Sequence, residues 1–278
     1  MTERLAQTTR RIESLQQLEA VVTAMRGISA SRVQQAHGLL PGLRAHAAVI
    51  ARAIGQALAL APGDQRPAEP RIHRSAVIVF CAEQGFAGAF SDRILEAAAQ
   101  KAGEQTVFLI GTRGAALASE RGIQVAWRTA MVPHANLVAA LAGRIADALY
   151  GWLSDQSGRQ VDIIVPTWSA GSGVVPERRS LVPFDFHRFA VSTSGQAPLI
   201  TLPPAVLLDR LAEEYVFAEL CEAALTAFAA ENEARVAAML SAKSNLGNMR
   251  SELQALERQI RQEEITAEVV ELAAGAIS

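Results

Sequence analysis

The chain has 278 residues, of which half are apolar, 19% are charged and 5% are aromatic. This length suits one large domain or two small ones. Its 26 basic and 28 acidic residues give a formal net charge of −2, which largely excludes a dedicated nucleic-acid-binding protein. The two cysteines, Cys81 and Cys221, cannot form a disulfide framework or a zinc site, and they indicate a cytosolic redox environment.

The sequence favours a protein without a membrane span of its own. Its N-terminus lacks the apolar region of a secretory signal. The longest uncharged stretch lies between Arg188 and Asp209, where Pro198 and the Pro203-Pro204 pair would leave a lipid-facing helix with unsatisfied backbone groups. We therefore expect a soluble chain, with docking onto a membrane complex left open.

Hydrophobic periodicity divides the chain into three parts. Residues 1–60 are predicted to form an N-terminal coiled-coil helix, residues 75–190 a central α/β head domain, and residues 205–278 a C-terminal coiled-coil helix. The segments 61–74 and 192–204 are rich in proline and glycine, so we expect them to be linkers.

An apolar seam is predicted on each long helix. On the first, three pairs of apolar residues are spaced by seven: Leu5 and Ile12, Leu15 and Val22, and Leu18 and Met25. On the last, steps of three and four alternate without a slip, which predicts a left-handed supercoil. These positions are Leu225, Phe228, Asn232, Arg235, Met239, Ala242, Leu246, Met249, Leu253, Leu256, Ile260, Glu263, Ala267, Val270 and Ala274. The Pro41-Gly42 pair is expected to kink or end the first helix.

The last helix is too long for a compact domain. About 70 residues in a helix would span roughly 100 Å, whereas a compact globule of this chain length measures only about 50 Å across. We therefore expect the two long helices to pair as an antiparallel coiled coil that projects from the α/β domain. Residues 265–278 are apolar nearly all round, so this end should need a partner surface, which we expect to be another protein.

Short β-branched runs alternate with helical segments in the middle part, which predicts a Rossmann-like α/β domain with a small, largely parallel sheet. The expected strands are 75–80, 106–111, 123–127 and 161–166, and the expected helices are 91–101, 113–121 and 136–152. Residues 179–187 contain a proline and are expected to add an edge strand.

Neither glycine-rich segment completes a nucleotide-binding motif. Residues 81–90 supply Gly85 and Gly88 as a G-x-x-G after the first strand, and no acidic residue closes the second strand to hold a ribose. Residues 111–117 lack the lysine and hydroxyl of a phosphate-binding loop. A tight strand-to-helix turn is the favoured interpretation, and a nucleotide site is the minor alternative.

The remaining reactive side chains form no catalytic pattern, so we expect no catalytic residue, no cofactor and no metal ion. Neither cysteine has a base beside it in the sequence. The five histidines form no i, i+4 pair that could hold a metal: His37, His46, His73, His134 and His187. The polar seam residues Asn232, Arg235 and Glu263 either set the register of the two helices or face a partner.

Four segments match motifs of one protein family. Residues 23–37, TAMRGISASRVQQAH, are similar to its T-K-A-M-x-x-V-A-A-S-K motif, and residues 231–248 to its E-x-A-R-M-x-A-M-x-x-A-T motif. Residues 261–276, RQEEITAEVVELAAGA, are similar to R-Q-A-x-I-T-x-E-I-x-E-I-x-x-G-A, and residues 81–90 stand in place of D-R-G-L-C-G. The chain thus resembles the gamma subunit of F-type rotary ATP synthases along its whole length.

This resemblance implies a central rotor shaft that is not itself a catalyst. In the family, the coiled coil enters a ring of alpha and beta subunits, and the α/β domain rests on the epsilon subunit and the membrane c-ring. Ion flow turns the c-ring, and the shaft drives ATP synthesis or hydrolysis in the beta subunits. The resemblance also implies a peripheral position on the cytoplasmic face of the bacterial inner membrane.

The matched positions imply contacts with partner subunits at two levels of the coiled coil. Loops of the ring would be contacted by five residues near the C-terminal end: Arg261, Gln262, Thr266, Glu268 and Glu271. Coupling contacts at a lower level are implied for Met25, Arg26 and Arg235.

The chain departs from the family at several motif positions. Thr23 is followed directly by Ala24 where the family has a lysine between them, Arg32 replaces the lysine of A-S-K, and Glu83-Gln84 replaces Asp-Arg. These departures leave open a divergent or second ATPase. Two other functions also remain: a Rossmann-like nucleotide-binding enzyme with a helical dimerisation arm, and a free-standing coiled-coil scaffold.

Overall fold

A computed structural model describes residues 3–60, 74–99, 105–154, 159–183, 189 and 199–275. They form two compact units: residues 1–30 with 235–278, here named the coiled-coil unit, and residues 31–234, the core unit. The elements follow in the order α1 (Glu3–Leu60), β1 (Arg74–Phe80), α2 (Phe90–Ala99), β2 (Gln105–Ile110), α3 (Thr112–Glu120), β3 (Val125–Thr129), η2 (Ala135–Leu137), α4 (Val138–Leu153), β4 (Arg159–Ser169), β5 (Gly173–Val182) and α5 (Pro204–Gly275).

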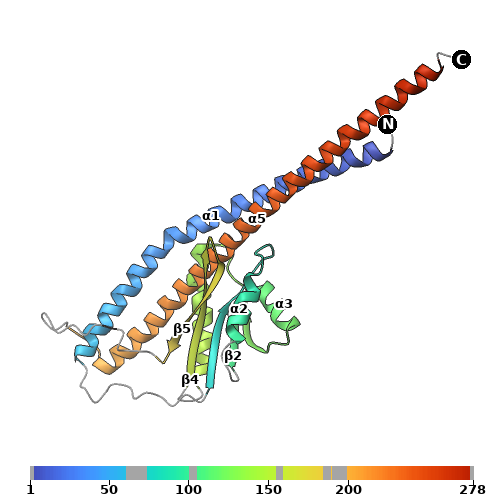
Figure 1. The fold of residues 1–278 in the computed structure, drawn as a ribbon. Coiled ribbons are helices and arrows are strands. Elements are labelled where there is room, and N and C mark those ends of the chain that lie inside the picture. Colours follow the sequence, from blue (N-terminus) through green and yellow to red (C-terminus); the bar gives the residue numbers. More distant parts are fainter. Residues whose placement is uncertain are drawn as a thin grey trace. The chain divides into compact units, whose positions relative to one another are not determined.

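The core unit contains a five-stranded sheet with the strand order β3-β2-β1-β4-β5 (Figure 1). Neighbouring strands are parallel except for β4 and β5, which are antiparallel. The last five residues of the central strand β1 are all buried, as expected for a strand that is covered on both faces. The predicted α/β domain with a largely parallel sheet is therefore confirmed.

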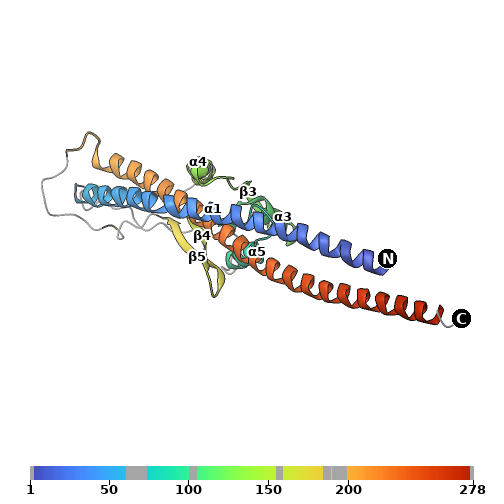
Figure 2. The same ribbon diagram turned by 90° about the horizontal axis from the view of Figure 1, so that it is seen from above.

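Helices cover both faces of this sheet (Figure 2). Ala76, Ile78 and Phe80 of β1 join one apolar cluster with α4 and with the core-unit parts of α1 and α5. Val77 and Val79 join a second cluster with α2 and α3. Because successive side chains of a strand point to opposite faces, one apolar strand supplies both cores.

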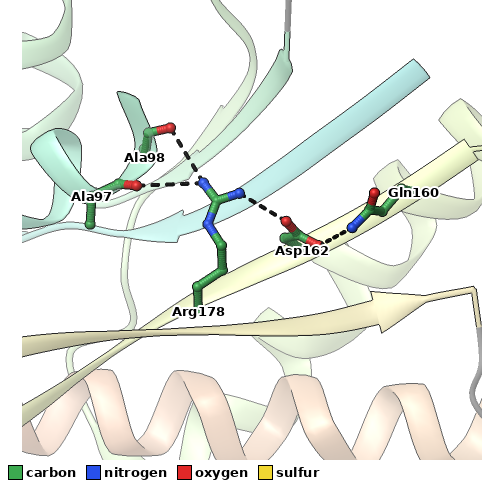
Figure 3. Close-up of polar contacts among 5 residues, drawn as sticks. All are labelled: Ala97, Ala98, Gln160, Asp162 and Arg178. Atoms are coloured by element: carbon green, nitrogen blue, oxygen red, sulfur yellow. Dashed lines mark hydrogen bonds and ion pairs between the residues drawn. The ribbon is translucent and has the colours of Figure 1, made fainter. Parts of the chain in front are cut away.

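An ion pair with a buried carboxylate ties α2 to β4 and β5 (Figure 3). Arg178 of β5 donates through Nη1 to Oδ2 of Asp162 at 2.8 Å, and Gln160 Nε2 donates to the other carboxylate oxygen at 2.8 Å. The second terminal nitrogen of Arg178 donates to the carbonyl oxygens of Ala97 and Ala98, at 3.5 and 3.3 Å, in the last turn of α2. This arginine therefore caps a helix end whose carbonyl groups lack partners within the helix.

The edge strand differs from the prediction of 179–187. It is β5, which begins at Gly173 and forms a hairpin with β4, itself extended to Ser169; residues 184–188 lie outside the described residues. Pro166 and Pro176 stand opposite each other in this pair. A proline in a segment argues against a strand, because proline donates no hydrogen bond to a neighbouring strand. One proline in each strand therefore concealed the hairpin in the sequence.

Long helices form in both terminal parts of the chain, and the first does not end at Pro41, one of the two outcomes expected for the Pro41-Gly42 pair. α1 continues to Leu60 with Pro41 inside it. Pro41 cannot bond the carbonyl of His37, but both residues are exposed, so water can satisfy that oxygen. The predicted linkers lie almost wholly outside the described residues, and the predicted boundaries of the three parts stay a prediction. No described helix is both long and apolar enough to cross a bilayer.

Candidate partner-binding surface

The candidate surface is built on the coiled-coil unit, where α1 and α5 run antiparallel. Arg250 Nη1 lies 2.6 Å from Glu19 Oε2, and Thr9 Oγ1 donates to Glu257 Oε1 at 3.3 Å. Glu19 comes after Thr9 in α1, whereas its partner Arg250 comes before Glu257 in α5, so the two helices run in opposite directions. The two contacts also fix the register of the pair. The predicted antiparallel coiled coil is confirmed.

The α1 seam is narrow and partly polar. Leu5, Thr8, Ile12 and Leu15 are buried and spaced by three and four, and Ser29, two heptads after Leu15, is buried as well. Leu18, which was predicted for this seam with Met25, is 51% exposed and does not belong to it. Leu18 instead begins an outward row with Val21, Met25 and Ile28, which sequence reasoning missed although its spacing of three, four and three signals one helix face.

The α5 seam follows the predicted register as far as Ile260, except at Met249. Met249 is 50% exposed, and the half-buried residue at this level is Arg250. The predicted positions Leu253 and Leu256 are again half-buried, so the departure is confined to one turn. Ile260, 3% exposed, is again buried, whereas Glu263 is exposed and accepts from Gln259 Nε2 at 3.0 Å. The predicted seam position of Glu263 is therefore wrong.

The eight predicted partner residues all lie in the coiled-coil unit, but their exposure differs. Met25 and Arg26 of α1 are half-buried, and Arg235 of α5 is only 3% exposed. The five residues near the C-terminal end are all exposed: Arg261, Gln262, Thr266, Glu268 and Glu271.

The polar bonds of this end lie within α5. Arg261 Nη2 donates to Glu257 Oε1 at 3.2 Å, and Thr266 Oγ1 donates to the carbonyl oxygen of Gln262 at 2.8 Å. Both bonds span one helical turn and leave much of each side chain in water, since the Arg261 side chain is 62% exposed. These groups remain accessible to a partner.

Large apolar side chains are also exposed beyond Ile260. Their exposed fractions rise along the helix from 56% to 70%: Ile265, Val269, Val270 and Leu272. Sequence reasoning identified this segment as apolar, but named only polar residues as contacts. An apolar surface of this kind is typical of a protein interaction site.

The turn that follows β1 shows no room for a phosphate at the neighbouring helix N-terminus. Glu83 accepts hydrogen bonds from Thr112 N at 2.9 Å, Thr112 Oγ1 at 2.8 Å and Met131 N at 2.9 Å. The N-terminus of a helix favours an anion, and at α3 the chain's own carboxylate takes that position. The tight-turn interpretation of residues 81–90 is the one that this geometry supports.

The cysteines are unsuited to nucleophilic chemistry. Burial raises the pKa of the Cys81 thiol to about 12 and that of the Cys221 thiol to about 11. The thiolate is the reactive form, so neither side chain is a nucleophile near neutral pH. In the described part of the chain, no three His, Cys, Asp or Glu side chains are grouped to hold a metal ion.

A family model described as ATP synthase matches residues 4–278. The chain belongs to this family. It is 27% identical to the ATP synthase gamma chain of Solibacter usitatus, with 96% of each chain covered. It is 28% identical to that of Streptomyces avermitilis, with 96% of this chain and 93% of the relative covered. The expected identification as a gamma subunit, the central rotor shaft of the complex, is confirmed.

Solved structures share the fold. The rotor of Euglena gracilis mitochondrial ATP synthase matches with a TM-score of 0.65 at 11% identity, covering 94% of this chain and 99% of that one. The central stalk and c-ring structure of the Tetrahymena thermophila enzyme matches with a TM-score of 0.56 at 14% identity, covering 80% and 99%. Both likenesses show the fold, and the family membership identifies the chain as a subunit of the ATP synthase complex.

Proposed function

We propose that the chain is the rotating shaft of an ATP synthase and carries out no chemical step itself. The observation that supports this most is the end of α5. Pairing with α1 buries Ile260, and the helix then continues to Gly275 with four large apolar side chains in water. A helix end that turns inside an apolar sleeve of partner subunits would be covered on every side.

The exposed polar residues of this end would contact the loops of the sleeve. Arg261, Glu268 and Glu271 offer charged groups of both signs, which can pair with counter-groups at a wet rim. Met25 and Arg26, which are half-buried, would contribute at a lower level. Arg235 is buried, so we infer that it acts through the packing of α5 rather than by direct contact.

The partners follow from the same role. The solved structures that match are named as rotor and as central stalk with c-ring. We infer that this chain assembles with alpha and beta subunits around its coiled coil, and with an epsilon subunit and a c-ring at its core unit. The complex would place it on the cytoplasmic face of the bacterial inner membrane.

Affinity purification from the native membrane tests this assembly. A tag inserted after Gly171, in the exposed turn between β4 and β5, leaves both long helices unmodified. We expect alpha, beta and c subunits to copurify with a single copy of the chain per ring. Recovery of the chain only with itself would support the scaffold, and stoichiometric binding of a nucleotide by the isolated chain would support the enzyme.

A pair of variants tests the contact residues. Arg261→Ala with Glu268→Ala should slow ATP-driven rotation of the reconstituted complex by about fivefold, the equivalent of roughly 1 kcal/mol of lost contacts. The matched control, Glu252→Ala with Arg258→Ala, removes exposed charges of the same kind from α5 before Ile260. Equal rates in both variants would contradict the proposed contacts.

A further inference from the structure

A groove of about 560 Å³ lies between α2 and the hairpin of β4 and β5. One side of it is the face of α2 that carries Arg93, Glu96 and Ala97, which are neighbours on a helix surface. Ile164 of β4 and Val174 of β5 line the groove with buried apolar side chains. Sites for small ligands commonly enclose about 300–1,000 Å³ and combine an apolar lining with a few polar groups. The volume and the lining therefore fit a small ligand.

Arg93 stands at the end of the groove nearest the hairpin turn, with a fixed position and an uncompensated charge. Its Nη1 donates to the carbonyl oxygen of Ser172 and, at 2.9 Å, to that of Val174. Both acceptors are neutral, and no carboxylate among the described residues forms an ion pair with Arg93. A guanidinium has five N–H donors. Arg93 can therefore bind an anion without releasing the hairpin.

The charges at the other end of the groove are already paired. Arg178 joins the carboxylate of Asp162 at 2.8 Å and the last carbonyl groups of α2 (Figure 3). Glu96 is exposed one helical turn from Arg93 and forms no ion pair within the described residues. A single carboxylate fits beside Arg93. A phosphate or a dicarboxylate would bring a second negative charge close to Glu96, which disfavours such ligands.

We propose that this groove binds a monocarboxylate with an apolar tail. The carboxylate of the ligand accepts charge-assisted hydrogen bonds from Arg93, and these are about twice as strong as bonds between neutral groups. The tail lies along Val174, Val175 and Pro176 of β5, and it covers the Val175 side chain, which is 37% exposed in the free chain. Removal of this apolar surface from water favours binding. The bound ligand would contact both α2 and β5 and so stabilise the hairpin.

Decanoate is the probe, and isothermal titration calorimetry of the full chain is the measurement. We expect one saturable site per chain and a rise in melting temperature with decanoate. Arg93→Gln should weaken binding about tenfold, because the carboxylate loses its charged donor. Glu96→Gln should tighten binding about threefold, because a nearby like charge is removed. A variant that binds more tightly is folded, so this second change separates recognition from loss of structure.

Two controls isolate the carboxylate and the groove. Decanol has the same apolar chain without the charge, and it should bind about tenfold more weakly than decanoate. Glu120→Gln removes an exposed carboxylate from α3, outside the groove, and should leave the affinity for decanoate unchanged. Equal affinity in Arg93→Gln and the unmodified chain would overturn the inference, as would equal affinity for decanol. Uptake without saturation would also overturn it, since that result indicates adsorption to exposed apolar residues such as Leu272.

Discussion

The same two helices are held together differently in the two units. In the core unit, residues 31–60 of α1 carry three arginines, two histidines and no acidic residue, whereas residues 204–234 of α5 carry seven acidic residues and one arginine. In the coiled-coil unit, both helices carry charges of both signs. The core-unit pairs that cross between the helices are Arg44–Glu222 at 2.9 Å, His37–Glu233 at 3.1 Å and His46–Glu214 at 3.4 Å.

The two units differ more in how much apolar surface their helices bury than in how their charges are distributed. Core-unit α5 contributes a wide buried face to the sheet and to α4, including Leu220 and Phe228. The coiled-coil unit has a single narrow seam, interrupted by Thr8 and Ser29. Exposed ion pairs contribute only about 0–1 kcal/mol each, so packing sets the difference. The core unit anchors both helices, and the coiled-coil unit leaves most of its surface for partners.

Matched leucine deletions on α5 should show the largest contrast. Leu220 is fully buried, and Leu220→Ala should lower the free energy of unfolding by about 2–5 kcal/mol through the cavity that it leaves. Leu253 is half-buried in the seam, and Leu253→Ala should cost about 1 kcal/mol. Denaturant titration of the full chain measures both. Equal losses would mean that the coiled-coil unit is packed as tightly as the core unit.

Removal of the buried carboxylate of β4 should have the next largest effect. The Asp162 side chain is 6% exposed, and Asp162→Ala should cost about 1–3 kcal/mol because Arg178 and Gln160 lose a charged acceptor. Asp92 pairs with Arg121 at a site that is 39% exposed, so Asp92→Ala should cost less than about 1 kcal/mol. Thermal unfolding of the two variants provides the comparison, and a neutral Asp162→Ala would show that the pair is dispensable.

Alkaline pH should weaken the core unit selectively. Burial is the main cause that raises the pKa of Cys81 and Tyr150 to about 12 and that of Cys221 to about 11, from ordinary values of 9.0 for cysteine and 10.0 for tyrosine. A group whose pKa is higher in the folded than in the unfolded protein contributes its full stabilisation at pH values below the unfolded-state pKa. That contribution is lost as the pH rises through the folded-state pKa. The coiled-coil unit contains neither cysteine nor tyrosine.

The denaturation midpoint of the core unit should therefore fall between pH 9 and pH 11, while pH 7 and pH 8 give the same value. Near-ultraviolet circular dichroism of its tyrosines and tryptophans follows this unit. Cys81→Ala should flatten the pH dependence whatever its effect on stability at neutral pH. An unchanged slope in that variant would contradict the role of the Cys81 thiol.

Local pattern was sufficient to predict most of the fold. The alternating apolar strands and the 3.5-residue repeat identified the sheet, the long helices and their antiparallel pairing. The hairpin at β5 was missed because Pro176 and the exposed run from Glu177 to Ser180 carry no strand signal, although pairing with β4 stabilises them. Pairing between strands is a property of the folded chain and cannot be seen in one segment.

The candidate surface could be predicted only in part, for the same physical reason. The apolar segment after Ile260 was evident, but Leu18 and Met249 were expected in the seam and are half-exposed. The predicted register of α5 resumes at Leu253, so the packing of single turns decides which side chain faces the partner helix. The bonds of Glu83 join residues that are 29 and 48 positions apart in the sequence, and no local motif announces them.

The smallest expected effect concerns the cross-helix pair of the coiled-coil unit. Glu19 and Arg250 lie 2.6 Å apart with side chains that are 23% and 35% exposed, so their coupling free energy should be about 0.5–1 kcal/mol. A double-mutant cycle with Glu19→Ala and Arg250→Ala measures it, and the Arg44–Glu222 pair of the core unit is the reference. Because Arg250 takes the seam position in place of Met249, Arg250→Met should place an apolar side chain there and stabilise the unit. A loss of stability in Arg250→Met would show that the ion pair, rather than the space it fills, holds this level of the coiled coil together.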